Sequence, residues 1–472
     1  MSVLLFINEV KRHLLSLRFV MALVFILTVY IGSSLVFCKK YLNEKEKDIG
    51  NLKNRQAEYQ NATGGAQGLY NNVYTLVKFQ ELSSFFGTGN EGRIPKAMII
   101  MPSAAQAQEA SGGMIVGQGG RNFKLENYAD FDLTFIVGVV LSFLALVFSF
   151  DAISGDREEG TLKLQVSNPV QRVQIFLAKY AAIVFLLLVM VFIGSLLSII
   201  IFQIFIGQNV LFLFPVESIF SILLSMVYLS MFVLLGLWIS ASVSKSTTSL
   251  AIILLIWIVL VVLSPYIGAL IAHRYYPVKS QQEQEEKFQA LIQSGSQHMP
   301  KELTNYYHGT GTESEWPAVE QYYIKQDESF EKLTVDRFQE LMNQAIKAEA
   351  LNFFSPYGAF RQAMQRIANT GLPYEEKFYW VGRQYRSDLA HFILSRDNID
   401  RTSKHHPAPD PRICSLSSQP IDPPTVPRFQ PPVRKIHIDD IQDALPAVGY
   451  LLILNLVFFM LTQFTVENMD VR

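Results

Sequence analysis

The chain has 472 residues, of which 50% are hydrophobic and only 17% are charged. Soluble domains rarely combine so many apolar residues with so little charge, and the apolar residues here gather in long runs, so we expect a membrane protein. The formal net charge of −1 offers no basic surface for nucleic acid, and two cysteines cannot form a disulfide framework.

Six nearly charge-free runs follow one another along the chain, and each supplies the roughly 20 residues that a helix needs to cross a bilayer. The run that follows Tyr180 is too long for one helix and breaks at the turn signal Gly-Gln-Asn, residues 207–209. Within the runs, the pairs Thr28/Gly32 and Gly138/Ser142 would permit close helix packing. We predict spans at residues 19–38, 131–150, 179–206, 216–241, 249–272 and 444–466.

Basic residues in the short connections indicate the orientation, because cytoplasmic loops carry an excess of Lys and Arg. They occur before the first span, in the segment at residues 151–178, between spans 4 and 5, and in the tail at residues 467–472, but not at residues 207–215. We therefore expect both termini and the 151–178 segment on the cytoplasmic side. The predicted fold is mainly α, a six-helix polytopic membrane protein with two extracytoplasmic insertions, residues 39–130 and 273–443.

The two insertions differ in pattern. Apolar residues at heptad-like spacing between residues 42 and 59 predict that the first helix continues out of the bilayer. In the second insertion, residues 280–294 and 328–351 read as amphipathic helices. The Pro-rich strip at residues 404–432 has neither a helical nor a strand pattern, which favours an extended surface connection.

Residues that could carry chemistry are sparse. The spans hold no ionisable residue at depth, and Asp132, Glu217 and His273 at their ends are read as interfacial anchors. The phosphate loop G-x-x-x-x-G-K-[ST], the zinc motif H-E-x-x-H and the G-x-S-x-G elbow are absent. His405 and His406 indicate a solvated loop rather than a metal site. We expect no catalytic, cofactor or metal site in this chain, so the energy for any transport must come from a partner.

The 151–178 segment stands between two very apolar spans and is predicted to form two short helical pieces. Ser154 is the expected N-cap of the first, and the acidic residues within 156–159 lie in the turn where a helix dipole favours anions. The second opens with a capping-box arrangement, Asn-Pro-Val-Gln at residues 168–171. On physical grounds alone, a well-capped cytoplasmic connection explains these features equally well.

The run SGDREEGTLKLQVSNPVQRVQIFLAK, residues 154–179, resembles the cytoplasmic segment between the second and third spans of ABC-2-type permeases, the membrane subunits of a class of ABC transporters. The family pattern is approximately S-G-E-R-E-x-G-T-L, a few apolar residues, then S-x-P-V-x-R and an apolar stretch that ends in G-K. Asp156 replaces the usual Glu, and Ala178 replaces the usual Gly. The residues that match are Ser154, Gly155, Arg157, Glu158, Glu159, Gly160, Thr161, Leu162, Ser167, Pro169, Val170, Arg172 and Lys179.

The resemblance implies that this segment seats in a groove of a separate ATP-hydrolysing subunit, which binds ATP and Mg²⁺. The docking residues it implies are Arg157, Glu158, Glu159, Gly160, Thr161 and Leu162. It also implies a dimer of permease chains, a bacterial inner membrane with both insertions in the periplasm, and an interfacial amphipathic helix at residues 1–18. We expect an exporter on this basis.

A stretch of the second insertion indicates which branch of the family the chain resembles. LNFFSPYGAFRQAMQRIANTG, residues 351–371, resembles the second external region of a large-loop branch whose outer domain has no assigned function. Members read L-N-P-x-S-P at this point, so Phe353 departs from the pattern while Ser355 and Pro356 keep it. The resemblance indicates a branch and leaves the substrate open.

Two other classes of function remain open. The chain could be a scaffold or mechanotransmission subunit of an ATPase-driven envelope complex that moves no substrate. The 151–178 segment does not separate these readings, but ATPase activity stimulated by a substrate would. A polytopic enzyme with its site in residues 272–443 has no motif in its favour. Transport direction, and the choice between identical and different permease chains, are equally open.

Overall fold

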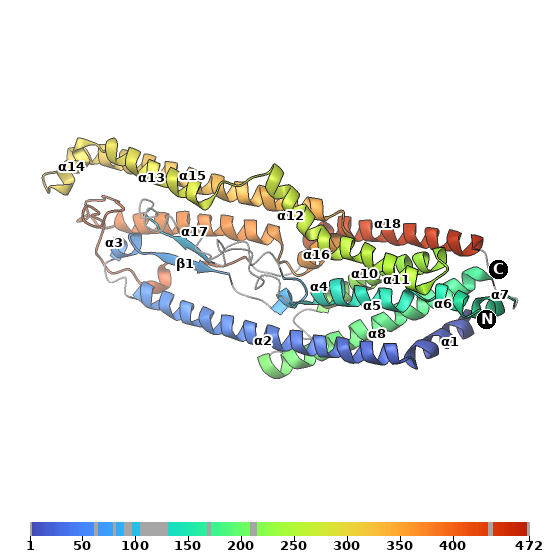
Figure 1. Ribbon diagram of the computed structural model, residues 1–472. Helices are drawn as coiled ribbons and strands as arrows, with labels where there is room; N and C mark the ends of the chain where they lie inside the picture. The colour runs from blue at the N-terminus through green and yellow to red at the C-terminus, as the bar shows by residue number, and fades with distance from the viewer. Residues whose placement is uncertain are drawn as a thin grey trace.

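The computed structural model describes residues 2–60, 65–78, 82–88, 97–103, 131–167, 171–207, 215–432 and 438–469. The molecule is elongated and mostly helical (Figure 1). Its first helix, α1 (Ser2–Leu14), lies at the same tip of the molecule as the end of the last helix. We call this tip the terminal end. In the described part, spans 1 to 6 are Leu17–Asn43, Leu133–Glu158, Arg172–Ile206, Glu217–Ser242, Ser246–Tyr275 and Gln442–Asn468. The predicted fold class, a mainly α polytopic membrane protein with six spans, is confirmed.

Four spans belong to uninterrupted helices. Span 1 is the first part of α2 (Leu17–Gln60), which continues beyond its apolar stretch for a total of 44 residues, as the heptad-like spacing predicted. At 1.5 Å per residue, α2 is about 66 Å long. Span 3 is α8 (Arg172–Ile206), span 4 lies in α10 (Pro215–Ser242), and span 6 lies in α18 (Ile438–Asn468).

Spans 2 and 5 each change helix type along their length. Span 2 consists, in order, of α4 (Leu133–Phe135), the π-helical segment η4 (Ile136–Leu141), α5 (Ser142–Ser149) and the short helix α6 (Ser154–Glu158). Span 5 consists of α11 (Ser246–Trp257), the π-helical segment η5 (Ile258–Leu263) and α12 (Ser264–Tyr275).

Spans 2 and 4 form the centre of the bundle. In their most apolar windows, 72% of span 4 and 67% of span 2 are buried within the chain, compared with 11% of span 5 and 17% of span 6. Tyr228 and Phe232 of α10 are fully buried at this centre. The exposed apolar faces of spans 5 and 6 are therefore suited to lipid or to another apolar surface.

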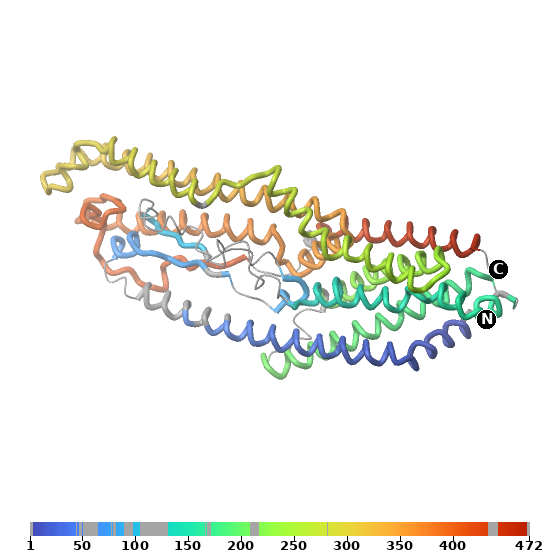
Figure 2. The backbone as a smooth tube through the Cα atoms, viewed as in Figure 1, coloured from blue at the N-terminus to red at the C-terminus, as the bar shows by residue number. Residues whose placement is uncertain are grey.

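The two insertions fold together into one outer part, on the left in Figure 2. The first contributes α3 (Gly65–Tyr70), β1 (Tyr74–Val77), η1 (Leu82–Phe85) and β2 (Ala97–Ile100). The second contributes α13 (Gln281–Gln297), α14 (Lys301–Tyr307), η6 (Glu313–Glu315), α15 (Trp316–Asn352), α16 (Pro356–Ile367), α17 (Leu372–Asp397) and η7 (Pro423–Thr425). Strands β1 and β2 pair antiparallel, with Tyr74 opposite Ile100, and share an apolar core with α15 and α17.

Both predicted amphipathic helices of the second insertion are confirmed, as α13 and as part of the longer α15. α13 begins with a capping box in which Ser280 Oγ accepts a hydrogen bond from the backbone of Glu283, while the Glu283 side chain accepts one from Ser280 N–H. The Pro-rich strip is extended, with one isolated bridge between His406 and Ser415 and the short turn η7.

Close packing between spans occurs partly where the sequence did not indicate it. Gly194 of α8 faces Tyr30 of α2, and a Cβ at Gly194 would overlap the Tyr30 ring, which is fully buried. Gly32 makes no such contact within the chain, because a Cβ there would meet no atom within 4 Å, and its packing against a second chain stays a prediction. Gly138 does admit a close neighbour, the Tyr357 ring.

Replacing the two glycines separately tests this packing. We expect Gly194→Ala to lower the thermal unfolding midpoint in detergent, because overpacking a buried contact costs roughly 1–3 kcal/mol. Gly32→Ala is the matched control and should leave the midpoint unchanged or raise it slightly, because alanine favours a helix over glycine by about 1 kcal/mol. Equal shifts for both variants would contradict the assigned contact between α2 and α8.

Candidate functional site

The 151–178 segment lies at the terminal end and forms two short helices ahead of span 3 (Figure 1). These helices are α6 (Ser154–Glu158) and α7 (Thr161–Ser167). Gly160 separates them with a φ of 73°, a left-handed conformation that glycine adopts without strain. The first of the two predicted helical pieces, which begins at Ser154, is therefore divided into α6 and α7.

The start of α6 is capped by a distant side chain. Ser154 was predicted as the N-cap, but the N-cap is Ile153, and Ser154 lies inside the helix with its hydroxyl donating to Phe150 O. The backbone N–H groups of Ile153 and Ser154 both donate to Ser240 Oγ, at 3.1 and 3.0 Å. The end of span 4 thus provides the acceptor that the sequence assigned to a local residue.

A buried carboxylate joins this segment to two other helices. Asp156 of α6 is 3% exposed, and its Oδ2 lies 2.6 Å from Lys179 Nζ of α8. Its Oδ1 accepts a hydrogen bond from Arg12 Nη1 of α1 at 3.1 Å. Gln165 Nε2 of α7 donates to the same carboxylate at 3.3 Å. The acidic residue that was expected to favour the helix dipole therefore holds α1, α6, α7 and α8 together.

Lys179 explains why this arrangement is required. Its side chain is 1% exposed, and Glu9 Oε1 of α1 accepts a second charge-assisted hydrogen bond from it at 3.0 Å. Removing an ammonium ion from water is expensive unless carboxylates compensate it. Two carboxylates and two cations meet here, so α1 cannot leave the bundle without exposing buried charge. This cluster of Glu9, Arg12, Asp156 and Lys179 is hereafter the charge cluster.

Two further side chains bind the ends of neighbouring helices. Arg157 donates to the carbonyls of Ala241 and Val243 at the end of α10, at 3.2 and 3.1 Å. Glu158 accepts from the backbone N–H and the hydroxyl of Ser246, the first residue of α11. A cation at a helix C-terminus and an anion at a helix N-terminus are both favourable with respect to the helix dipole.

Arg172 makes a third attachment. α8 begins at this residue, with Gln171 at the N-cap, and the predicted start at residues 168–170 lies outside the described residues. Its guanidinium donates to the carbonyls of Glu467 and Met469 at the end of α18, at 3.1 and 2.9 Å. The 151–178 segment is therefore bonded directly to spans 4, 5 and 6.

The six predicted docking residues divide between the interior and the surface. Leu162 is 2% exposed, and Arg157 is occupied with α10. The Thr161 hydroxyl donates to Asp156 O at 3.2 Å, and Glu158 is exposed but bonded to Ser246. Glu159 is exposed, and a Cβ at Gly160 would meet no atom within 4 Å. α7 adds exposed residues that the prediction did not include, among them Lys163 and Leu164, the latter 68% exposed.

Sequence reasoning missed the charge cluster and Ser240. Arg12 was used as an orientation signal and as part of the polar face of the predicted interfacial helix, Lys179 as an orientation signal and a match to the family pattern, and Glu9 was not singled out. The one available signal was Lys179 itself, a cation placed where a long apolar helix begins. An ammonium ion in that position demands a carboxylate partner.

Two residues read as interfacial anchors are buried instead. The carboxylate of Asp132 caps α4 by accepting from Phe135 N at 2.7 Å, and it accepts from Thr88 N at 2.6 Å, which fixes the first insertion to span 2. Glu217 is also buried, at the start of α10, whereas His273 is exposed at the end of α12.

The two adjacent histidines have separate partners. His405 Nδ1 lies 2.6 Å from Asp397 Oδ2. His406 is 3% exposed, stacks on Trp316 with ring centroids 3.9 Å apart, and has Glu313 Oε2 2.9 Å from its Nε2. Burial lowers the pKa of His406. The solvated-loop interpretation is wrong for His406, and among the described residues no group of three His, Cys, Asp or Glu could hold a metal ion.

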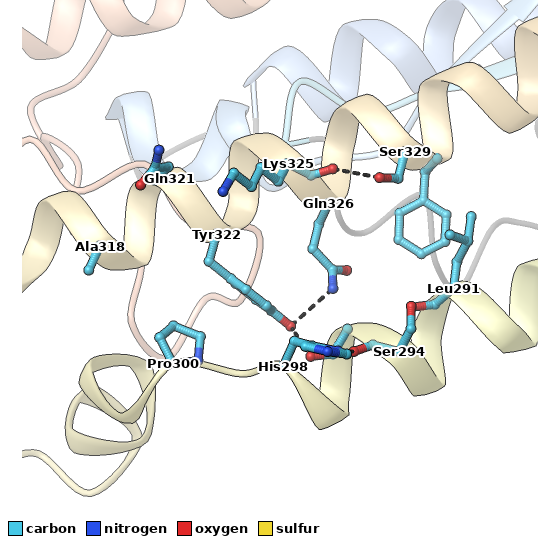
Figure 3. A pocket seen from close by; sticks show the side chains of 12 residues that line it. Leu291, Ser294, His298, Pro300, Ala318, Gln321, Tyr322, Lys325, Gln326 and Ser329 are labelled. Atoms are coloured by element: carbon cyan, nitrogen blue, oxygen red, sulfur yellow. Dashed lines mark hydrogen bonds between the residues drawn. The ribbon is translucent and has the colours of Figure 1, made fainter.

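A groove of about 480 Å³ lies between α13 and α15 in the outer part (Figure 3). Tyr322 and Gln326 of α15 face Ser294 and Gly295 of α13 across it. The Tyr322 hydroxyl donates to Gly295 O and accepts from Gln326 Nε2, both at 3.1 Å. The groove can hydrogen-bond a polar ligand. Its lining includes Ser294 and His298, but the Ser294 hydroxyl donates to Leu291 O and His298 Nδ1 lies 2.8 Å from the Ser294 carbonyl, so the two side chains are not paired as a nucleophile and a general base.

Comparison with protein families gives a match over nearly the whole chain. The model of a family described as ABC-2 family transporter protein matches residues 3–470. That range includes all six spans, both insertions and the charge cluster. Comparison with curated proteins gave no match.

The stability of variants tests whether the charge cluster stabilises the fold. Asp156→Asn leaves Lys179 buried with one carboxylate fewer, which should cost about 3–5 kcal/mol and lower the unfolding midpoint, measured by tryptophan fluorescence in detergent. Adding Lys179→Met should recover part of the loss, because the two residues act as a pair. Asp151→Asn is the control, since its partner Arg18 is largely exposed and surface pairs contribute about 0–1 kcal/mol. If the two Asp→Asn variants unfold alike, the cluster does not stabilise the fold.

Proposed function

The chain belongs to the ABC-2 family of transporter proteins, and from this premise we propose that it is an exporter permease driven by separate ATPase subunits. A permease of this family is the membrane component of an ABC transporter and is not itself catalytic. In the proposal, ATP and Mg²⁺ bind to the ATPase, and this chain converts the movement of that subunit into movement of its spans.

One observation carries the proposal. The 151–178 segment is bonded to the ends of spans 4, 5 and 6 and, through the charge cluster, to α1 and span 3. A displacement applied to such a segment must either move these helices with it or break buried, charge-assisted contacts. That is the mechanical property that a coupling element requires.

The exposed face of the segment supplies the docking surface in this proposal. We assign the contact with the ATPase to Glu159, Gly160, Lys163 and Leu164, which offer two opposite charges and one apolar side chain on adjoining turns. Thr161 lies at the edge of this surface. Arg157, Glu158 and Leu162 hold the segment against the bundle, so their part in docking is indirect.

The charge distribution supports an orientation with both termini in the cytoplasm, and the family resemblance suggests a bacterial inner membrane with the outer part in the periplasm. The basic residues of the N-terminal region and the short connections belong to the terminal end (Figure 1), and cytoplasmic connections carry such an excess. They are Lys11, Arg12, Arg18, Arg157, Lys163, Arg172 and Lys245.

A second permease chain completes the proposed assembly. Only 11% of the apolar window of span 5 is buried within one chain, so most of this span is available to lipid and to a second chain. A transport path at the junction of two chains needs no deep ionisable group, because the ATPase supplies the energy. The substrate and the identity of the second chain, the same or a related permease, are left open by the proposal.

The second candidate function, a mechanotransmission subunit that moves no substrate, is favoured by the shape of the outer part. α15 is a single helix of 37 residues, about 55 Å long at 1.5 Å per residue, and it runs away from the spans (Figure 1). The groove between α13 and α15 would then receive an envelope partner. Stimulation of ATP hydrolysis by a transported compound favours the permease, and stimulation by an envelope protein favours this alternative.

Reversing one exposed charge tests the docking surface. Glu159→Arg should abolish the stimulation of ATP hydrolysis that the permease gives its ATPase, because it places a cation where the proposed groove meets an anion. The measurement is phosphate release by the purified ATPase with increasing amounts of permease in nanodiscs.

The matched control is Glu376→Arg, which reverses another exposed Glu, in the outer part on α17. This variant should stimulate the ATPase as the unmodified chain does, and both variants should unfold at the unmodified temperature. Full stimulation by the Glu159→Arg protein would show that the docking surface lies elsewhere.

A further inference from the structure

The groove between α13 and α15 follows one stripe of each helix (Figure 3). Residues that line it recur at intervals of three and four, which place them on one face of a helix. They include Ala318, Tyr322, Lys325 and Ser329 on α15, and Leu291 and His298 on the α13 side. From Ala318 to Ser329 this face of α15 is about 17 Å long at 1.5 Å per residue. The groove is therefore the seam beside a pair of helices.

The two helices are fixed against each other at this seam. A Cβ at Gly295 of α13 would overlap the Gln326 amide of α15, so the glycine permits a close approach. The Tyr322 hydroxyl donates to Gly295 O and accepts from Gln326 Nε2. The rings of Phe288 and Phe330 lie with their centroids 4.9 Å apart. A surface held in this way is already formed before a partner arrives, which lowers the cost of binding.

α13 uses little of its own surface to hold its place. Among the described elements, α15 is the one against which α13 packs extensively. Of the described side chains of α13, Phe288 is buried, and Gly295 is buried where the helices approach. The seam offers apolar contacts at Leu291 and Ala318 beside polar side chains. A seam of this kind matches the helix-in-groove mode, in which an amphipathic helix lays residues of helical spacing along a groove.

The charge of the groove indicates what a partner must present. Among the described residues that line it, Lys325 alone carries a fixed charge. Lys325 is exposed, and no carboxylate of the described part of the chain is paired with it. His298 Nδ1 lies 2.8 Å from Ser294 O and must donate to it, so in the neutral ring Nε2 is an acceptor. The complementary surface is a carboxylate opposite Lys325 and a hydrogen-bond donor near His298.

We propose that the groove between α13 and α15 binds an amphipathic helix of an envelope protein, oriented by a carboxylate opposite Lys325. The inference goes beyond the proposed function, because it requires neither a substrate nor the ATPase. It applies equally to a permease and to a mechanotransmission subunit. Only the location of the partner, outside the cytoplasm, depends on the proposed orientation of the chain.

Photocrosslinking of the full chain in its own membranes tests the proposal. p-Benzoylphenylalanine would replace Gln321 in one protein and Ser329 in another, two groove positions about 12 Å apart along α15. Mass spectrometry would then identify the residues of the partner that each position captures. A helix along the groove should be captured at residues about eight apart. An extended segment would be captured at residues about four apart.

The Lys325→Glu variant tests the charge. It should lower the crosslinking yield at residue 321 by at least about tenfold, because it sets two like charges against each other. The matched control is Lys332→Glu, which reverses an exposed lysine on the same helix outside the groove lining and should keep the full yield. p-Benzoylphenylalanine in place of Ile324, which is 52% exposed on another side of α15, should capture little of the partner.

Several results would overturn the proposal. They are partner residues about four apart, capture of a second copy of this chain, equal yields from the two Lys→Glu variants, and no protein captured at residue 321. Crosslinking from Lys163 separates this inference from the proposed function. An ATPase captured at residue 163 with nothing at residue 321 would keep the proposed function and remove this inference. A partner helix at residue 321 without an ATPase at residue 163 would do the reverse.

Discussion

The structure depends on the burial of one ammonium ion at the base of span 3. Lys179 is 1% exposed, and the carboxylates of Asp156 and Glu9 make that position tolerable. Because Asp156 belongs to α6 and Glu9 to α1, this requirement fixes the positions of two short helices that the sequence predicted without predicting their contact. Arg12 donates a hydrogen bond to Asp156 and supplies the second positive charge of the cluster. The result is a terminal end in which a short, partly exposed segment is bound to the bundle by charges that cannot separate cheaply.

Polar contacts hold the bundle at both ends. At one end they are made to the ends of helices, and at the other to the π-helical segments. At the terminal end, Arg157 binds the end of span 4, Glu158 binds the start of span 5 and Arg172 binds the end of span 6. At the other end, α16 binds spans 2 and 5 at their π-helical segments. Between these ends the contacts are largely apolar, and apolar surfaces slide past one another more cheaply than paired charges separate. In the proposed function, a displacement applied by the ATPase is transmitted along the spans and is not absorbed at their ends.

The sequence predicted what depends on local composition. The six spans follow from the length of apolar runs, and the extension of α2 and the helices α13 and α15 follow from periodicity. Contacts between distant residues were not predictable. Asp156 and Arg12 are 144 residues apart, and Ser240 caps a helix 86 residues earlier. Local rules therefore assigned Ser154 as a cap and read Asp156 as a dipole partner. The π-helical segments left no signal in runs that are apolar on every face.

The composition of the native complex tests the central claim most directly. The chain would be purified gently from its own membranes, and the mass of the intact assembly would be measured. The account predicts two permease chains together with two subunits that carry a nucleotide-binding phosphate loop. A chain recovered alone or only with envelope proteins, under conditions in which other ABC complexes stay intact, would contradict the coupling role of the 151–178 segment.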